Sequence, residues 1–136
     1  MKSVTCIALM FAAAVSIFAQ DQETLDKRTP QEKKIDSPIF VSLMRFEDSL
    51  SAGVPRDQSM SCFYQFLRDT TNRIYVIIKV HGGNSDAQSA IEETGGSIAK
   101  NYLGKIYCWV KPESLRSLIK IEAIIGIEMF HSPKTQ

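Results

Sequence analysis

The stretch 73-RIYVIIKVHGGNSDAQSAIEETGGSIAKNYLGKIYCWVKPESLRSLIKIEAIIGIEMFHS-132 decides the fold of this 136-residue chain. It opens with alternating side chains over residues 73–81, the pattern of a half-buried strand. Two glycines end that run before residues 85–94, where apolar residues at helical spacing predict a short helix. Residues 97–103 and 105–111 are two extended runs separated by a glycine. The first part of the stretch therefore predicts strand, helix, strand and strand.

The rest of the stretch adds one helix and one strand. Pro112 suits the first position of a helix, which we expect to run to about Ile121. Residues 124–131 form the last extended run. The full order is strand-helix-strand-strand-helix-strand, the split βαβ plan of the ferredoxin-like two-layer sandwich. We therefore predict an α+β domain over residues 73–132, with two helices packed on one face of an antiparallel sheet.

Alternation sorts the strand residues onto two faces of this sheet. One face carries small aliphatic groups suited to packing under helices: Ile74, Val76, Ile78, Val80, Ile106, Cys108, Val110, Ile127 and Met129. The other, which we call the open face, is aromatic where a two-layer sandwich meets water, and an exposed apolar patch of this kind marks an interaction surface. Its predicted partner-binding residues are Tyr75, Ile77, Tyr107, Trp109, Glu128 and Phe130, edged by Lys79 and Lys111.

A helical extension is predicted before the sheet, over residues 37–72. Ser37-Pro38 is a helix start, and apolar residues follow at helical spacing until Gly53. A second amphipathic piece is expected over residues 59–68, with one apolar side made of Met60, Phe63, Tyr64 and Leu67. These helices either cover the open face as internal core or dock elsewhere on the sheet unit or a partner. A homodimer formed sheet to sheet is the third arrangement.

The N-terminal residues carry an export signal. Residues 1–19 combine Lys2 with an apolar run and a small residue at Ala19, the pattern of a cleaved secretory signal peptide, with an uncleaved anchor as the alternative. We therefore expect a secreted or periplasmic protein that begins near Gln20. Residues 20–36 are charged and poor in large apolar groups, so we expect a flexible segment there.

Charge and cysteine usage limit the classes of partner. The formal net charge is +1, and removal of a leader that contains Lys2 lowers it to zero. We therefore expect no nucleic-acid partner and no membrane contact after signal cleavage. Cys62 and Cys108 lie after the leader and can form one disulfide in an exported protein, although Cys108 also suits a buried strand position. No Cys or His spacing indicates a metal site, and we expect no cofactor.

Several motifs of the stretch resemble a known family. They are the strand Tyr-Val-Ile-Ile-Lys-Val at residues 75–80, the helix end Thr-Gly-Gly at 94–96, Lys-Pro-Glu-Ser-Leu at 111–115 and Ile-Ile-Gly-Ile-Glu at 124–128. Together they resemble the propeptides of subtilisin-type serine proteases and the stand-alone inhibitors built on the same module. The resemblance covers about the last half of the chain after the leader.

The resemblance implies a binding mode. Members lay the open sheet face on two surface helices of the protease and thread the segment after the last strand into the substrate cleft. In this chain Glu128 would cap a protease helix N-terminus. The inserting tail would be Ser132, Pro133, Lys134, Thr135 and Gln136, of which residues 133–136 lie beyond the folded domain. No protease domain follows in the sequence, so we expect action in trans, as an inhibitor or a folding helper.

Two other classes of function compete with the inhibitor. A small ferredoxin-like binding or structural module, dimeric or not, would use the same sheet without any protease. An enzyme is not expected: His81 and His131 are the only histidines, both at strand ends, and neither is predicted to lie near a serine or cysteine nucleophile.

Overall fold

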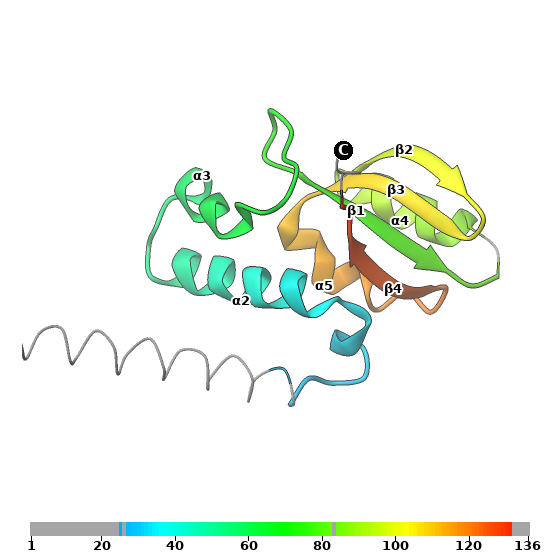
Figure 1. Ribbon diagram of the computed structural model, residues 1–136, viewed down its shortest axis with the longest axis horizontal. Helices are drawn as coiled ribbons and strands as arrows, with labels where there is room; N and C mark the ends of the chain where they lie inside the picture. Colours follow the sequence, from blue (N-terminus) through cyan, green and yellow to red (C-terminus); the bar gives the residue numbers. More distant parts are fainter. Residues whose placement is uncertain (1–24, 26, 83, 132–136) are drawn as a thin grey trace, which may run out of the picture.

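The sheet is centred on strand β1 (Ile74–Val80), whose side chains alternate between buried and half-buried. Strands β3 (Lys105–Val110) and β4 (Ile124–Met129) flank β1, and β2 (Ser97–Tyr102) pairs with the far side of β3. All three pairings are antiparallel, and the strand order is β2-β3-β1-β4 (Figure 1). Each of the four predicted strands forms close to its expected bounds.

The computed structural model describes residues 25, 27–82 and 84–131. This part of the chain is an α+β protein with four α-helices and a four-stranded antiparallel sheet, arranged as a two-layer sandwich (Figure 1). The predicted signal peptide, residues 1–19, and the predicted inserting tail, residues 132–136, lie outside the described residues.

Two helices pack under the aliphatic face of the sheet. Helix α4 (Ser85–Glu93) follows β1, and the helix predicted from Pro112 begins as the 3-10 turn η3 (Pro112–Ser114) and continues as α5 (Leu115–Leu118). Their apolar side chains are fully buried in one cluster with the strand residues: Ala87, Ile91, Leu115, Leu118, Ile74, Val76, Ile78, Ile106, Cys108, Val110 and Ile127. The face predicted to be the core is therefore the core, except that Met129 at its edge is only partly buried.

The predicted helical extension also forms. Helix α2 (Ser37–Ser51) begins at the predicted Ser-Pro start, and α3 (Arg56–Ser59) and the 3-10 turn η2 (Met60–Phe63) follow. Phe63 packs edge to face against Phe46 and Phe66, with ring centroids 5.6 and 5.4 Å apart. The second amphipathic piece is shorter than predicted, because helical structure ends at Phe63.

The extension enlarges the core and does not cover the open face. The apolar side chains of α2 belong to the same buried cluster as the aliphatic face. A guanidinium on α5, that of Arg116, binds both carboxylate oxygens of Glu47 on α2, at 2.7 and 2.8 Å. Helix α2 thus lies beside α5 (Figure 1), whereas no aromatic side chain of the open face packs against that cluster.

Residues 27–36, expected to be flexible, have a defined course along β4. Ile35 is buried and pairs with Ile127 of β4, while the Asp36 N–H donates to the Ile127 carbonyl at 3.0 Å. The Arg28 guanidinium donates to the Ile35 carbonyl at 2.7 Å, and the Lys34 ammonium donates to the Ile119 carbonyl at 3.1 Å. The bonds to Ile119 and Ile127, far along the chain, order a segment whose own composition is that of a flexible one.

Candidate partner-binding face

Cross-strand pairing brings the predicted open-face residues into contact. Tyr75 on β1 lies opposite Trp109 on β3, while Ile77 lies opposite Tyr107 on one side and Glu128 on the other. Side chains directly opposite each other in an antiparallel pair interact most strongly. The six residues chosen from the alternation pattern thus form one continuous surface. It ends at Phe130, which lies just beyond β4.

Four aromatic rings form the centre of this surface. The Tyr75 ring packs edge to face against the rings of Trp109 and Phe130, with both pairs of centroids 4.8 Å apart. Tyr107 reaches Phe130 at 6.4 Å. Edge-to-face pairs at these distances stabilise one another beyond the area that they bury. The cluster is therefore held in shape before any partner arrives.

The open face is half-buried, in contrast to the fully buried face beneath it. Residues of β1 and β3 alternate strictly, with every aliphatic-face residue buried and every open-face residue partly exposed. Burial by neighbouring side chains raises the pKa of the Tyr75 phenol. A contact that removed the remaining exposed area from water would be favourable, because apolar area is the main source of binding free energy.

The charged rim of the face is formed by lysines and one acid. Lys79 forms an ion pair with Glu128 across the β1–β4 pair, and the hydrogen bond that its ammonium donates to the Glu128 carboxylate raises the pKa of Lys79. The ammonium of Lys100 on β2 lies over the rings of Tyr102 and Tyr107, 5.3 and 5.5 Å from their centroids. Glu128 thus lies on the face as predicted, but it already has a partner.

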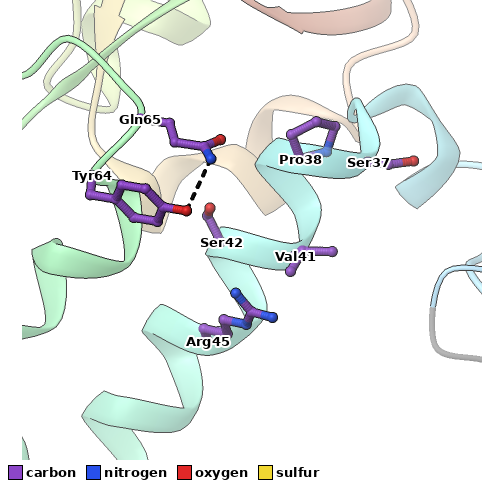
Figure 2. A pocket seen from close by; sticks show the side chains of 7 residues that line it. All are labelled: Ser37, Pro38, Val41, Ser42, Arg45, Tyr64 and Gln65. Carbon is purple, nitrogen blue, oxygen red and sulfur yellow. Dashed lines mark hydrogen bonds between the residues drawn. The ribbon is translucent and has the colours of Figure 1, made fainter. Parts of the chain in front are cut away.

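Two hollows adjoin Tyr64, which follows η2. A hollow of about 380 Å³ lies between residues 64–67 and residues 129–131, so it continues the open face beyond Phe130. A second, of about 280 Å³, lies between helix α2 and the pair Tyr64–Gln65 (Figure 2). There the Gln65 amide donates to the Tyr64 hydroxyl at 3.0 Å, as Figure 2 shows.

The sequence pattern did not indicate these hollows. Tyr64 and Leu67 were expected to pack with Met60 and Phe63, yet Tyr64 is 73% exposed and Leu67 is 48% exposed. The helical turn ends before Tyr64, so these two side chains leave the apolar side that a longer helix would have given them.

The two cysteines do not form the disulfide that was considered for them. Cys108 is buried under the sheet, where its thiol lies 3.9 Å from the Val76 carbonyl, and burial raises its pKa to about 12. Cys62 lies in η2, 4.0 Å from the Ser49 hydroxyl of α2. Both thiols are free, because they belong to different elements with different neighbours.

The described residues present no other clear site. Within this part of the chain, no three His, Cys, Asp or Glu side chains are grouped as metal ligands. None of its helices is both long and apolar enough to cross a bilayer. His81 and His131 are exposed at the ends of β1 and β4. The aromatic face is therefore the strongest candidate for function.

Comparison with known proteins gives no match: no family model, no curated protein and no solved structure is similar to this chain. Function has to be inferred from the chain's own residues.

Proposed function

We propose that the chain is an exported, propeptide-like inhibitor or folding helper of a subtilisin-type serine protease, built on a ferredoxin-like domain. The strand order β2-β3-β1-β4 supports the domain, because the split βαβ plan requires β1 and β3 at the centre of the sheet. The motifs at residues 75–80, 94–96, 111–115 and 124–128 support the family.

The observation that carries the proposal is the uncovered aromatic cluster on β1 and β3. A preformed apolar surface consists of Tyr75, Trp109 and Phe130, and no described helix covers it, not even the two helices of the extension. Aromatic side chains in such a patch dominate the energetics of protein interfaces. On the proposed function, two helices of the protease occupy the place that α2 and α3 leave open.

Two further parts of the chain have roles in this proposal. Residues 132–136 follow the last strand directly and enter the substrate cleft in an extended form, paired as an added strand. Glu128 accepts hydrogen bonds from the N–H groups at the N-terminus of a protease helix. Its carboxylate must then either leave Lys79 or bind Lys79 and these N–H groups together. Binding through Glu128 therefore depends on how firmly Lys79 holds it.

The proposal is tested by titrating the purified exported chain against a subtilisin-type protease, with a chymotrypsin-fold protease as control. Selective inhibition is expected, and deletion of residues 132–136 should abolish it while the melting temperature stays unchanged. Full inhibition by the shortened chain would overturn the tail mechanism. An intact chain that does not inhibit and sediments as a dimer would favour the sheet-to-sheet homodimer instead.

A further inference from the structure

The turn between β2 and β3 combines two unfavourable features in one residue. Leu103 is 84% exposed, the most exposed of the large apolar side chains in the described residues. It also has a positive φ of 47°, followed by Gly104 at 78°. A two-residue hairpin turn of this kind favours Asn-Gly, because a side chain with a branched apolar body is strained at positive φ.

The two-residue turn requires the positive φ, but the fold does not explain why a leucine holds this exposed position. A leucine that is almost fully exposed gains no packing to offset its backbone strain. Residues that break a local rule without a gain in stability are concentrated at functional sites. The turn therefore points to a contact that the isolated chain does not make.

Other exposed apolar side chains lie at the same end of the sheet. The Val80 N–H donates to the Gly104 carbonyl at 2.9 Å, and Val80 pairs with Ile124 at the start of β4, so the turn, the end of β1 and the start of β4 meet (Figure 1). Tyr102 is 56% exposed and Ile125 is 53% exposed. Three of the six exposed large apolar side chains of the described residues thus gather here, at the end of the sheet away from α2 and α3.

Lysines lie directly behind this apolar tip. Tyr102, Lys105 and Lys79 stand in one cross-strand row, and Lys100 lies over the Tyr102 ring. No carboxylate of the described residues forms an ion pair with Lys100 or Lys105, and Glu128 pairs with Lys79 alone. The near-neutral charge of the whole chain conceals this local excess of positive charge.

We propose that this end of the open face docks on an anionic lipid surface, with the β2–β3 turn as its inserting tip. Along the tip the side chains change from leucine at the outermost point to a tyrosine and then to lysines. Side chains of these types lie in the same order in a bilayer interface, with the leucine deepest and the lysines at the level of the phosphates. A pocket on a partner protein would accept the leucine but would not account for uncompensated lysines around it. One leucine with a few lysines gives weak, reversible binding that depends on salt.

This inference does not rest on the proposed protease contact, which is centred on Tyr75, Trp109 and Phe130 toward the other end of the sheet. The test measures co-sedimentation of the exported chain with phosphatidylcholine vesicles, with and without phosphatidylglycerol. We expect binding to the anionic vesicles alone and release in about 0.5 M salt. Leu103→Asn should lower the partition coefficient about tenfold, the factor for withdrawing one leucine from an apolar phase.

The same variant separates a binding role from a structural one. Leu103→Asn supplies the favoured turn residue, so its melting temperature should rise by about 2–5 °C while binding falls. Lys100→Gln with Lys105→Gln should lower binding to anionic vesicles, and Val54→Asn, at an exposed site far from the turn, should change nothing. Unchanged binding of Leu103→Asn, or no binding of the wild type, would overturn the proposal. Weaker protease inhibition by Leu103→Asn without vesicle binding would also overturn it and assign the tip to a protein partner.

Discussion

The indole ring of Trp109 meets the phenol ring of Tyr75 edge to face, with centroids 4.8 Å apart and planes inclined at 67°. The two residues are direct partners across the β1–β3 pair. Their contact joins the two central strands on the side of the sheet that no described helix covers, so a change in either ring alters the surface more than the core.

Trp109→Ala should therefore weaken binding to a subtilisin-type protease by at least about 2 kcal/mol, roughly a thirtyfold loss of affinity, because tryptophan at the centre of an interface is a typical hot spot. Inhibition constants for the variant and wild type measure the effect. Val54→Ala removes apolar area at an exposed site between α2 and α3, away from the open face and its adjoining hollow, so it should leave affinity unchanged. A Trp109→Ala chain with wild-type affinity and a lower melting temperature would place the indole in a purely structural role.

Gly96→Ala should destabilise the fold by about 2–3 kcal/mol through overpacking. A methyl group at Gly96 would lie 2.7 Å from the Trp109 carbonyl oxygen and 2.9 Å from the Ile91 carbonyl oxygen, both of them backbone atoms that cannot turn aside. Gly53→Ala is the matched control, since its methyl would meet nothing within 4 Å and only the positive φ of 87° is strained, at about 1 kcal/mol. Urea unfolding of both variants measures the difference, and equal losses would contradict the close approach.

Stability should decrease in acid partly through Glu32. The backbone N–H of Thr29 and the Arg116 guanidinium lower the pKa of the Glu32 carboxyl from its usual 4.5. A carboxyl whose pKa is lower in the folded chain stabilises the fold above the unfolded pKa, and this stabilisation is lost as pH falls through the folded value. Glu32→Gln should therefore lower the melting temperature at pH 7, and the difference from the wild type should shrink as pH falls below 4.5.

The expected difference for Glu32→Gln is modest, at or below about 1 kcal/mol, because the ion pair is partly exposed. Melting curves of wild type and variant between pH 7 and 3 measure it. Glu92→Gln, on an exposed position of α4, serves as control and should follow the wild type throughout. A Glu32→Gln difference that grew toward low pH would have the wrong sign for this explanation.

The thiols of Cys62 and Cys108 should differ in reactivity. Burial raises the pKa of Cys108 to about 12, so almost no thiolate forms at pH 8 and the sulfur is also inaccessible. Cys62 is partly exposed. A thiol reagent should label Cys62 in the folded chain and Cys108 only after unfolding in urea. If no thiol were released by urea without a reductant, the cysteines would be paired after all.

The sheet and its two faces were predictable because strand periodicity is local. The alternation in residues 73–81 and 105–111 assigns Tyr75 and Trp109 to one side whatever the rest of the chain does. The geometry of the candidate site was predictable to the same extent, since the six chosen residues share one face, whereas their binding role stays a prediction.

The placement of the N-terminal part was not predictable in this way. Ile35 is buried where Ile127, far along the chain, pairs with it, and the buried apolar side chains of α2 place this helix beside α5, where Arg116 binds Glu47. The exposure of Leu103 was likewise not predictable, since only the assembled sheet shows that the described residues leave this side chain 84% exposed. Composition alone favoured a flexible segment where the tertiary structure supplies partners.

The pairing of Ile35 with Ile127 has a consequence for self-assembly. A sheet with two free edges can add copies at both and grow into a fibre. In this chain the outer side of β4 is occupied at Ile127 by residues 35–36, whereas β2 has β3 as its single strand neighbour among the described residues. Edge-to-edge joining is therefore hindered at β4, and a chain that joins through β2 alone stops at a pair instead of polymerising.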